Sequence, residues 1–165
     1  MRITIVKGKG QDHIHVRRPD GSAVETGFPH KGPFPHDAMH YIVESRLALS
    51  HGFWGLVAAG HHPEAIVNLA KSAGHASAKR AVEPDSAIIE LLQAERLVEC
   101  FEADLWSGGG DPETLRQTSA AACTTSFVPA PTVDDDTIAA IRGDVAAMAA
   151  LWREGRLELD WPASA

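Results

Sequence analysis

Apolar and polar residues alternate along the first 28 positions of the chain, as they do in strands that bury one face of a sheet. The alternation runs through residues 3–6 and 13–16, and a shorter stretch of the same kind covers residues 23–26. Turns that contain glycine separate these stretches, and glycine readily adopts the positive φ that tight turns need. The pattern therefore predicts a small antiparallel sheet in residues 1–28.

The pattern changes at a linker, residues 29–35, which holds three prolines and one glycine and so suits neither a helix nor a central strand. Apolar residues then recur at helical spacing through residues 36–154. Residues 156–161 alternate again, and we expect them to form a C-terminal strand that joins the N-terminal sheet.

Start and stop signals divide the helical region into four to six helices, opened by proline or acidic residues and mostly closed by glycine. The expected helices cover approximately residues 36–50, a short segment ending at Gly60, 63–72, 83–106, a short helix after Asp111, and 135–154. Segregation of strands from helices predicts a mainly helical α+β fold. The length of 165 residues predicts one domain, 1–165.

Composition narrows the classes of partner. The chain has 22 acidic and 15 basic residues, and its net charge of −7 repels nucleic acid and anionic membranes. No stretch approaches the ~20 apolar residues of a membrane span, so we expect a cytoplasmic protein. Cys100 and Cys123 lack the spacing of a disulfide framework or zinc knuckle. A small-molecule substrate, another protein or a second copy of the chain in a homo-oligomer remain as expected partners.

One segment, His36 to Glu44, concentrates the residue types that carry chemistry. On a helix, His36, Asp37, His40 and Glu44 fall within a sector of about 100°, because residues four apart lie on one face. Two imidazoles at this spacing can bind one divalent ion, of which zinc is the common example. Glu44 is a candidate third ligand, and Asp37 a candidate catalytic base.

The longest predicted helix offers further carboxylates. Glu95, Glu99 and Glu102 lie at positions i, i+4 and i+7, and Glu95 and Glu102 flank its core stripe. If this helix packs antiparallel to residues 36–50, one of these carboxylates faces the histidines, as in metal sites of helical bundles. We therefore add Glu95 and Glu99 to the candidate metal ligands.

Two resemblances follow from these residues. The sequence His36-Asp37-Ala38-Met39-His40 is similar to the His-Glu-x-x-His signature of zinc peptidases, which implies zinc on the two histidines and an acid between them as general base. Asp37 replaces the longer glutamate of that signature. The run from Phe34 to Gly60, with its His-Asp-x-x-His-Tyr-x-x-Glu helix, resembles an uncharacterised bacterial protein family and implies no activity.

The favoured hypothesis is a metal-binding protein that acts as a metal-dependent hydrolase, since a bound divalent ion lowers the pKa of its water. The alternative is a module without metal that binds a ligand or protein through aromatic residues in and near the linker. Those residues are Phe28, Phe34, Phe53 and Trp54. The other histidines, His13 and His15 on a strand and His61 and His62 before a helix, are expected mainly at the surface.

Overall fold

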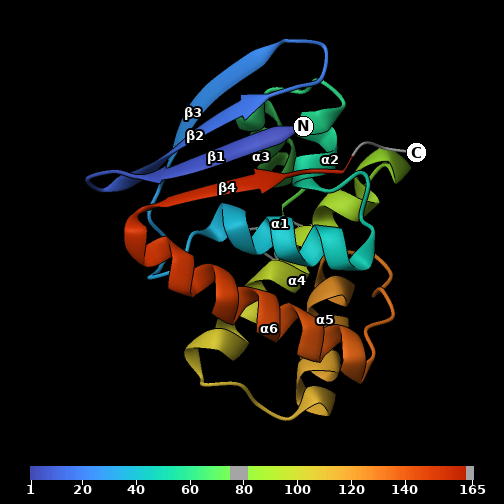
Figure 1. The fold of residues 1–165 in the computed structure, drawn as a ribbon. Helices are drawn as coiled ribbons and strands as arrows, with labels where there is room; N and C mark the ends of the chain where they lie inside the picture. The colour runs from blue at the N-terminus through green and yellow to red at the C-terminus, as the bar shows by residue number, and fades with distance from the viewer. Residues whose placement is uncertain (75–81, 163–165) are drawn as a thin grey trace.

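The computed structural model describes residues 1–74 and 82–162 of the chain. These residues form a four-stranded antiparallel sheet that lies against a group of six α-helices, which confirms the predicted α+β class (Figure 1). The strands are β1 Arg2–Lys7, β2 Gln11–Arg17, β3 Ala23–Pro29 and β4 Arg156–Asp160. The sheet order is β3-β2-β1-β4, so the C-terminal strand joins the N-terminal sheet as expected, and it pairs with β1.

The strand register explains the alternating sequence pattern. Ile3 pairs with Val16 of β2 and Leu159 of β4, and all three side chains are buried. Ile5 stands in the same way between Ile14 and Leu157. Because successive side chains of a strand point to opposite faces, these residues form one apolar face that packs on the helices.

The helices are α1 His36–Leu47, α2 Phe53–Ala58, α3 Pro63–Ser72, α4 Ile89–Trp106, α5 Pro112–Thr125 and α6 Asp135–Leu151, with short 3-10 turns at Ser86–Ile88 and Trp152–Glu154. Three boundaries differ from the sequence prediction. The first helix ends at Leu47 because Ala48 adopts a left-handed φ of 52°. The longest one, predicted from residue 83, begins at Ile89 after the 3-10 turn. The last one, predicted to end at residue 154, ends at Leu151 and continues as the second 3-10 turn.

The expected start signals of two helices are satisfied by hydrogen bonds. Asp111 accepts a bond from the backbone nitrogen of Thr114 at the start of α5, and Asp134 accepts one from Thr137 at the start of α6. Each aspartate therefore satisfies a backbone N–H that has no partner within its helix.

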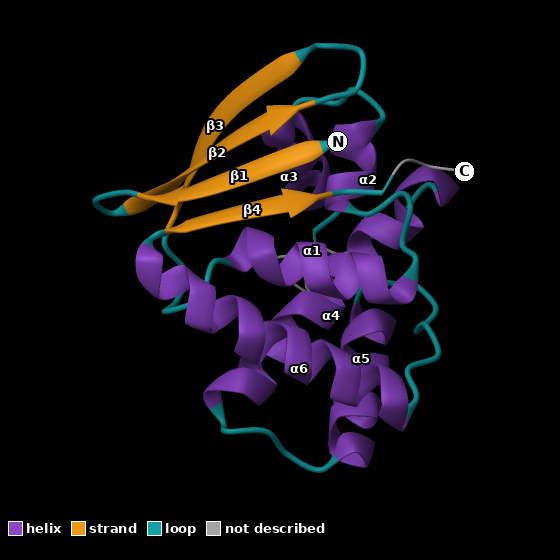
Figure 2. Cartoon of the chain, in the orientation of Figure 1, coloured by secondary structure: helices purple, strands orange, loops and turns teal. Residues whose placement is uncertain are grey.

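The first helix, α1, is central to the molecule. It lies beneath the sheet and above α4 and α6, as Figure 2 shows, and it also contacts α2. Its buried residues include three polar side chains: Asp37, His40 and Glu44. Burying ionisable groups is unfavourable unless they are paired, so the partners of these residues decide what the helix can do.

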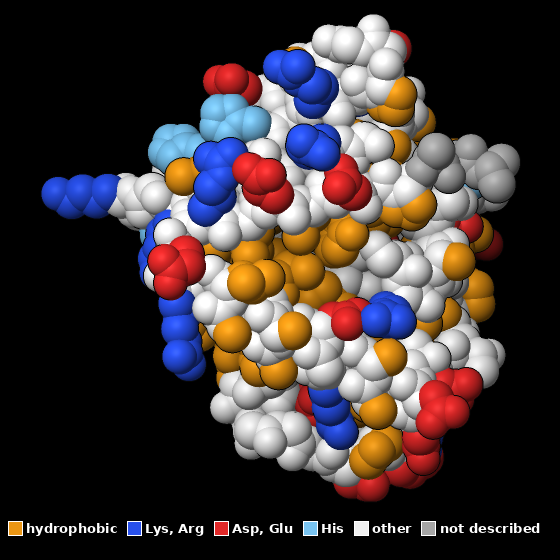
Figure 3. Space-filling view, in the orientation of Figure 1, with side chains coloured by type: hydrophobic (Ala, Val, Ile, Leu, Met, Phe, Trp, Pro, Cys, Tyr) orange, Lys and Arg blue, Asp and Glu red, His pale blue; other side chains and the backbone are white. Residues whose placement is uncertain are grey.

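An apolar hollow lies where β4 passes over α1 and α6. It appears as the orange area near the centre of Figure 3 and is lined in part by Ile42, Met148, Leu151 and Leu157. Arg46 and Asp144, bonded to each other at 2.6 and 2.9 Å, also line it. In the described part of the chain, no helix is long and apolar enough to cross a membrane.

Candidate metal centre

The histidines of α1 face carboxylates of α4. His36 Nδ1 lies 2.8 Å from Glu102 Oε1, and His40 Nε2 lies 3.7 Å from Glu95 Oε2. As the residue number rises along α1 it falls along α4, so the two helices run antiparallel here. The two histidines are four residues apart on α1, about one helical turn, and the glutamates that they contact are seven residues apart on α4, about two turns.

Three of these side chains form a compact group of potential ligands. His36, His40 and Glu95 each offer one ligand atom, and these atoms lie within 4.8 Å of one another. The two imidazole rings are 4.8 Å apart between centroids and nearly perpendicular. Two imidazoles and one carboxylate are a donor set that zinc and similar divalent ions accept. The described residues therefore contain a group that could hold a metal.

Each imidazole has one ring nitrogen held by a carboxylate. The carboxylate of Glu102 contacts Nδ1 of His36, and the carboxylate of Glu44 contacts Nδ1 of His40 at 2.9 Å. Because an ionised carboxylate only accepts, the proton resides on Nδ1 in both rings. The neutral form of each ring then presents a lone pair at Nε2. Metal-binding histidines in proteins are commonly oriented by this kind of carboxylate contact.

The side chain of Glu44 is completely buried, and its carboxylate accepts three hydrogen bonds. Besides His40, its carboxylate accepts bonds from the backbone nitrogens of Phe53 and Trp54, both at 2.9 Å. These nitrogens belong to the first turn of α2, which has no partner for them within the helix. Glu44 therefore joins the start of α2 to the imidazole of His40.

Gly52 makes this contact sterically possible. A Cβ atom at position 52 would lie 2.5 Å from the carboxyl carbon of Glu44, far inside van der Waals contact. The backbone before α2 can approach the carboxylate only because residue 52 has no side chain. The sequence therefore needs glycine here for close approach and not for an unusual φ, which is −69°.

Burial and charge shift the ionisation of the group. Burial on its own lowers the pKa of His40, but Glu95 and Glu44 outweigh it and raise that pKa to about 10. Burial raises the pKa of Glu44, against the effect of its three donors. Without a metal, His40 therefore carries a proton on Nε2 that faces Glu95. A bound cation would take the place of that proton.

Asp37 lines the cavity into which this group opens. The cavity has a volume of about 360 Å³, and its walls also include His36, His40 and Glu95. Burial raises the pKa of Asp37, while His36, His40 and Lys31 act in the opposite direction. The indole nitrogen of Trp54 donates to the backbone oxygen of Asp37 at 2.9 Å, which fixes the start of α1.

The structure separates the remaining candidate ligands from the group. Glu99 is half exposed and accepts a bond from Arg96 at 2.9 Å on the same helix. Glu44 contacts His40 at Nδ1, the nitrogen away from Glu95. Neither belongs to the group of His36, His40 and Glu95 that is found among the described residues. Glu102, which the sequence pattern placed beside the core stripe but which was not among the candidate ligands, is the residue that contacts His36.

The other histidines lie in different surroundings. His13 and His15 are on the exposed face of β2, and His15 lies 3.1 Å from the exposed Glu25. His62 precedes α3 and accepts a bond from the backbone nitrogen of Glu64 at 3.3 Å. These contacts need no ligand.

The aromatic residues of the alternative hypothesis are largely part of the core. Phe34, Phe53 and Trp54 are 6%, 3% and 0% exposed. Phe28 is partly buried and its ring meets that of Phe53 edge-on, with 6.3 Å between centroids. A partner could therefore not reach Phe34 and Trp54 without a rearrangement of the core, whereas Phe28 and Phe53 line a cavity.

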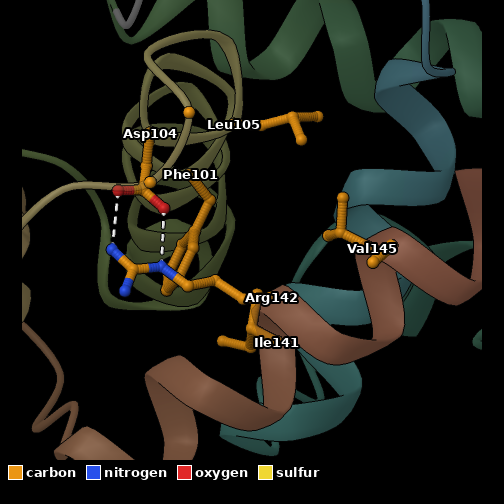
Figure 4. A pocket seen from close by; sticks show the side chains of 9 residues that line it. Phe101, Asp104, Leu105, Ile141, Arg142 and Val145 are labelled. Atoms are coloured by element: carbon orange, nitrogen blue, oxygen red, sulfur yellow. Dashed lines mark hydrogen bonds and ion pairs between the residues drawn. The ribbon is translucent and has the colours of Figure 1, made fainter.

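A second polar cluster lies near the C-terminal end of α4, where Asp104 follows Glu102 by two residues. Arg142 of α6 donates to both carboxylate oxygens of Asp104, at 2.8 and 2.7 Å, as Figure 4 shows. Arg142 also donates to the backbone oxygen of Gly110, and the nitrogen of Gly110 donates to Asp104. Arg142 holds the pKa of Asp104 below its usual value. The two side chains border a mainly apolar cavity of about 260 Å³.

Comparisons with known proteins add no identification. No protein-family model matches the chain, and no curated protein and no solved structure matches it significantly. The assignment of the site therefore rests on the chemistry of its own residues.

Proposed function

We propose that the protein binds one divalent metal ion through Nε2 of His36, Nε2 of His40 and the carboxylate of Glu95, and that it acts as a metal-dependent hydrolase. The observation that carries the metal site is the pairing of both Nδ1 atoms with carboxylates, 2.8 Å for His36 and 2.9 Å for His40. This pairing leaves both Nε2 atoms for a cation, and Nε2 of His40 lies 3.7 Å from Glu95 Oε2.

The charges of the cluster also favour a cation. Glu44, Glu95 and Glu102 bring three carboxylates to the imidazoles of His36 and His40. A divalent ion adds positive charge among these carboxylates while both imidazoles stay neutral. Two imidazoles and one carboxylate suit zinc best among the common metals, and they leave at least one coordination position for water or substrate.

Hydrolysis is the reaction class that this arrangement supports best. A divalent ion with an open position lowers the pKa of its bound water towards neutrality. Asp37 lines the same cavity as the three ligands and is buried beside them. We assign to Asp37 the role of general base, in which its carboxylate would accept a proton from that water. In this scheme Glu44 and Glu102 orient the imidazoles and do not bind the metal.

Metal analysis tests the binding part of the proposal. Chelator-treated protein is loaded with zinc, dialysed and analysed by inductively coupled plasma mass spectrometry. We expect one ion per chain in the wild type and none in the His36→Ala/His40→Ala variant. The matched control is His13→Ala/His15→Ala, which should retain one ion. Substoichiometric metal in the wild type, or an equal amount in the two double variants, would refute the metal site.

The hydrolase part needs a separate measurement. Metal-loaded protein is assayed with a panel of p-nitrophenyl carboxylate and phosphate esters, before and after chelation. We expect metal-dependent turnover that Asp37→Asn reduces by about 10²-fold or more, the scale of general base catalysis, without loss of the ion. Turnover that is absent, or that survives chelation, would reject hydrolysis and leave the metal site as a separate result.

A further inference from the structure

The cavity above the proposed metal centre carries positive charge at its edge, although the protein as a whole is acidic. Lys31 from the linker before α1 and Lys71 from α3 both line it, and both are exposed. Neither lysine side chain forms an ion pair or a hydrogen bond in the described part of the chain. Lys31 is close enough to Asp37 to influence its ionisation. Two ammonium groups are thus available for a ligand at one opening.

The rest of the cavity wall is apolar. Phe28, Pro29, Phe53 and Val67 line it beside the ligand group. A volume of about 360 Å³ lies at the lower end of the range of small-molecule sites. The cavity therefore suits a small molecule with an apolar body, and it is too small for a macromolecular segment.

The charge expected at the cavity once a divalent ion is bound indicates the sign of charge of the molecule that it binds. A divalent ion with two neutral imidazoles and the Glu95 carboxylate has a net charge of about +1, and the two lysines add two more. One ionised Asp37 still leaves the groups that line the cavity with a net charge of about +2. Glu44 and Glu102 lie behind the imidazoles and do not line the cavity, and counting their carboxylates as well brings the sum to about zero. In a chain of net charge −7, the wall of this cavity is therefore locally less acidic, and the two lysines at its opening favour anions.

We propose that the cavity binds small anionic molecules, with an oxyanion group held between Lys31 and Lys71 and an apolar body against Phe28 and Phe53. This substrate class rests on the proposed metal-dependent function for its chemistry, but the lysine contacts do not require the metal. Carboxylates and phosphonates share the oxyanion, and the experiment distinguishes them.

Isothermal titration calorimetry with benzoate, phenylphosphonate and the neutral benzyl alcohol tests the proposal on the zinc-loaded and the metal-free protein. We expect at least one of the two anions to bind about tenfold tighter than benzyl alcohol. Lys31→Ala/Lys71→Ala should lose about tenfold in affinity for that anion, and the Lys→Arg pair at both positions should restore most of it. The stronger of the two anions identifies the preferred oxyanion.

The matched control removes the same charge elsewhere. Lys9→Ala/Arg153→Ala changes two exposed cations that do not line this cavity, and its affinity should equal that of the wild type. Equal affinity of the wild type and Lys31→Ala/Lys71→Ala, or equal binding of benzyl alcohol, would overturn the proposal. If the wild type failed to hold zinc but still bound the anion in a way that depends on the two lysines, the metal site alone would be rejected. Unchanged circular dichroism spectra ensure that each variant is folded.

Discussion

The helix α4 contributes carboxylates to two buried clusters that differ in their balance of charge. At one end, Asp104 meets Arg142 in a two-bond ion pair with one charge of each sign. Further along, Glu95 and Glu102 meet His36 and His40, and Glu44 adds a third carboxylate. The first cluster is neutral and closed by its own hydrogen bonds. The second brings three carboxylates to two imidazoles, and it opens to a cavity.

This difference separates a structural ion pair from a candidate binding site. Arg142 is permanently charged and uses its donors on Asp104 and Gly110, so the pair leaves no electron pair directed at a ligand. An imidazole can lose a proton and then donate a lone pair to a metal. Burial alone is thus a weak indicator of function, whereas buried carboxylates that orient two imidazoles beside a cavity indicate a cation site.

The largest expected effect comes from Glu44→Ala, measured by urea unfolding of the metal-free protein. The change leaves two buried backbone N–H groups and His40 without their acceptor, so we expect a loss of about 3–5 kcal/mol in unfolding free energy. Glu99→Ala, at a half-exposed position, is the control and should change stability by less than about 0.5 kcal/mol. Similar losses for both variants would contradict the role of Glu44.

The pH dependence of the metal-free protein follows from His40. Its pKa in the folded state is about 10, above the unfolded value of 6.5, so its charged form stabilises the fold. That contribution is complete below pH 6.5 and is lost as pH rises through 10. Urea unfolding at pH 6.5, 8 and 9.5 should show a decline that His40→Gln removes. A decline of equal size in both proteins would exclude His40 as its source.

Metal affinity should depend on the carboxylate behind His36. We expect Glu102→Ala to weaken zinc binding about 10- to 100-fold, or ~1.4–2.8 kcal/mol, because the imidazole loses its orienting partner. Glu102→Gln keeps an acceptor oxygen and should lose less. Competition titration with a chromogenic chelator measures both constants. Equal affinities for wild type and Glu102→Ala would show that this contact plays no part in binding.

The neutral cluster should respond in stability alone. Arg142→Ala is expected to lower the unfolding free energy by about 1–2 kcal/mol, a value reduced for the partial exposure of Arg142. Zinc affinity, measured by the same titration, should stay within about twofold of the wild type. A large loss of zinc binding would show that the two clusters on α4 are coupled and would end the distinction between them.

The smallest effect is expected at the exposed histidines of the sheet. His13→Ala/His15→Ala should change the unfolding free energy by less than about 0.5 kcal/mol and leave the zinc titration unchanged, since neither ring is buried. The pair has a spacing that can chelate a metal on a strand but lacks a buried carboxylate behind each ring. If this variant no longer bound zinc, the metal site would lie on the sheet and not on α1.

The arrangement of the fold was predictable because its signals are local. Alternation in the strands, the proline-rich linker and the capping residues Asp111 and Asp134 each act within a few residues. The return of β4 to the N-terminal sheet was also expected, since only a sheet face can bury the alternating apolar residues of the C-terminal segment, but its pairing with β1 was not specified. The early end of α1 at Leu47 was not predicted, because it depends on a left-handed Ala48, a conformation that the sequence does not encode strongly.

The candidate site was only partly predictable because it depends on tertiary packing. The spacing of His36 and His40 is visible in the sequence, and a facing carboxylate followed from antiparallel packing. Glu95, Glu99 and Glu102 lie within about 60° on a helical projection, which is too narrow to tell which of them faces α1. The contacts of Glu44 with α2 depend on the course of the chain through Gly52, which no periodicity describes.

The bonds of Glu44 also have a consequence for the order of folding. They join residues only 9 and 10 positions apart, whereas the contact of His36 with Glu102 spans 66 positions. Short loops close with less loss of chain entropy and usually form sooner. We therefore expect α1 and α2 to associate first, with His40 already aligned, and α4 to add its carboxylates later. On this time course metal capture is the last event, and the chain folds without waiting for it.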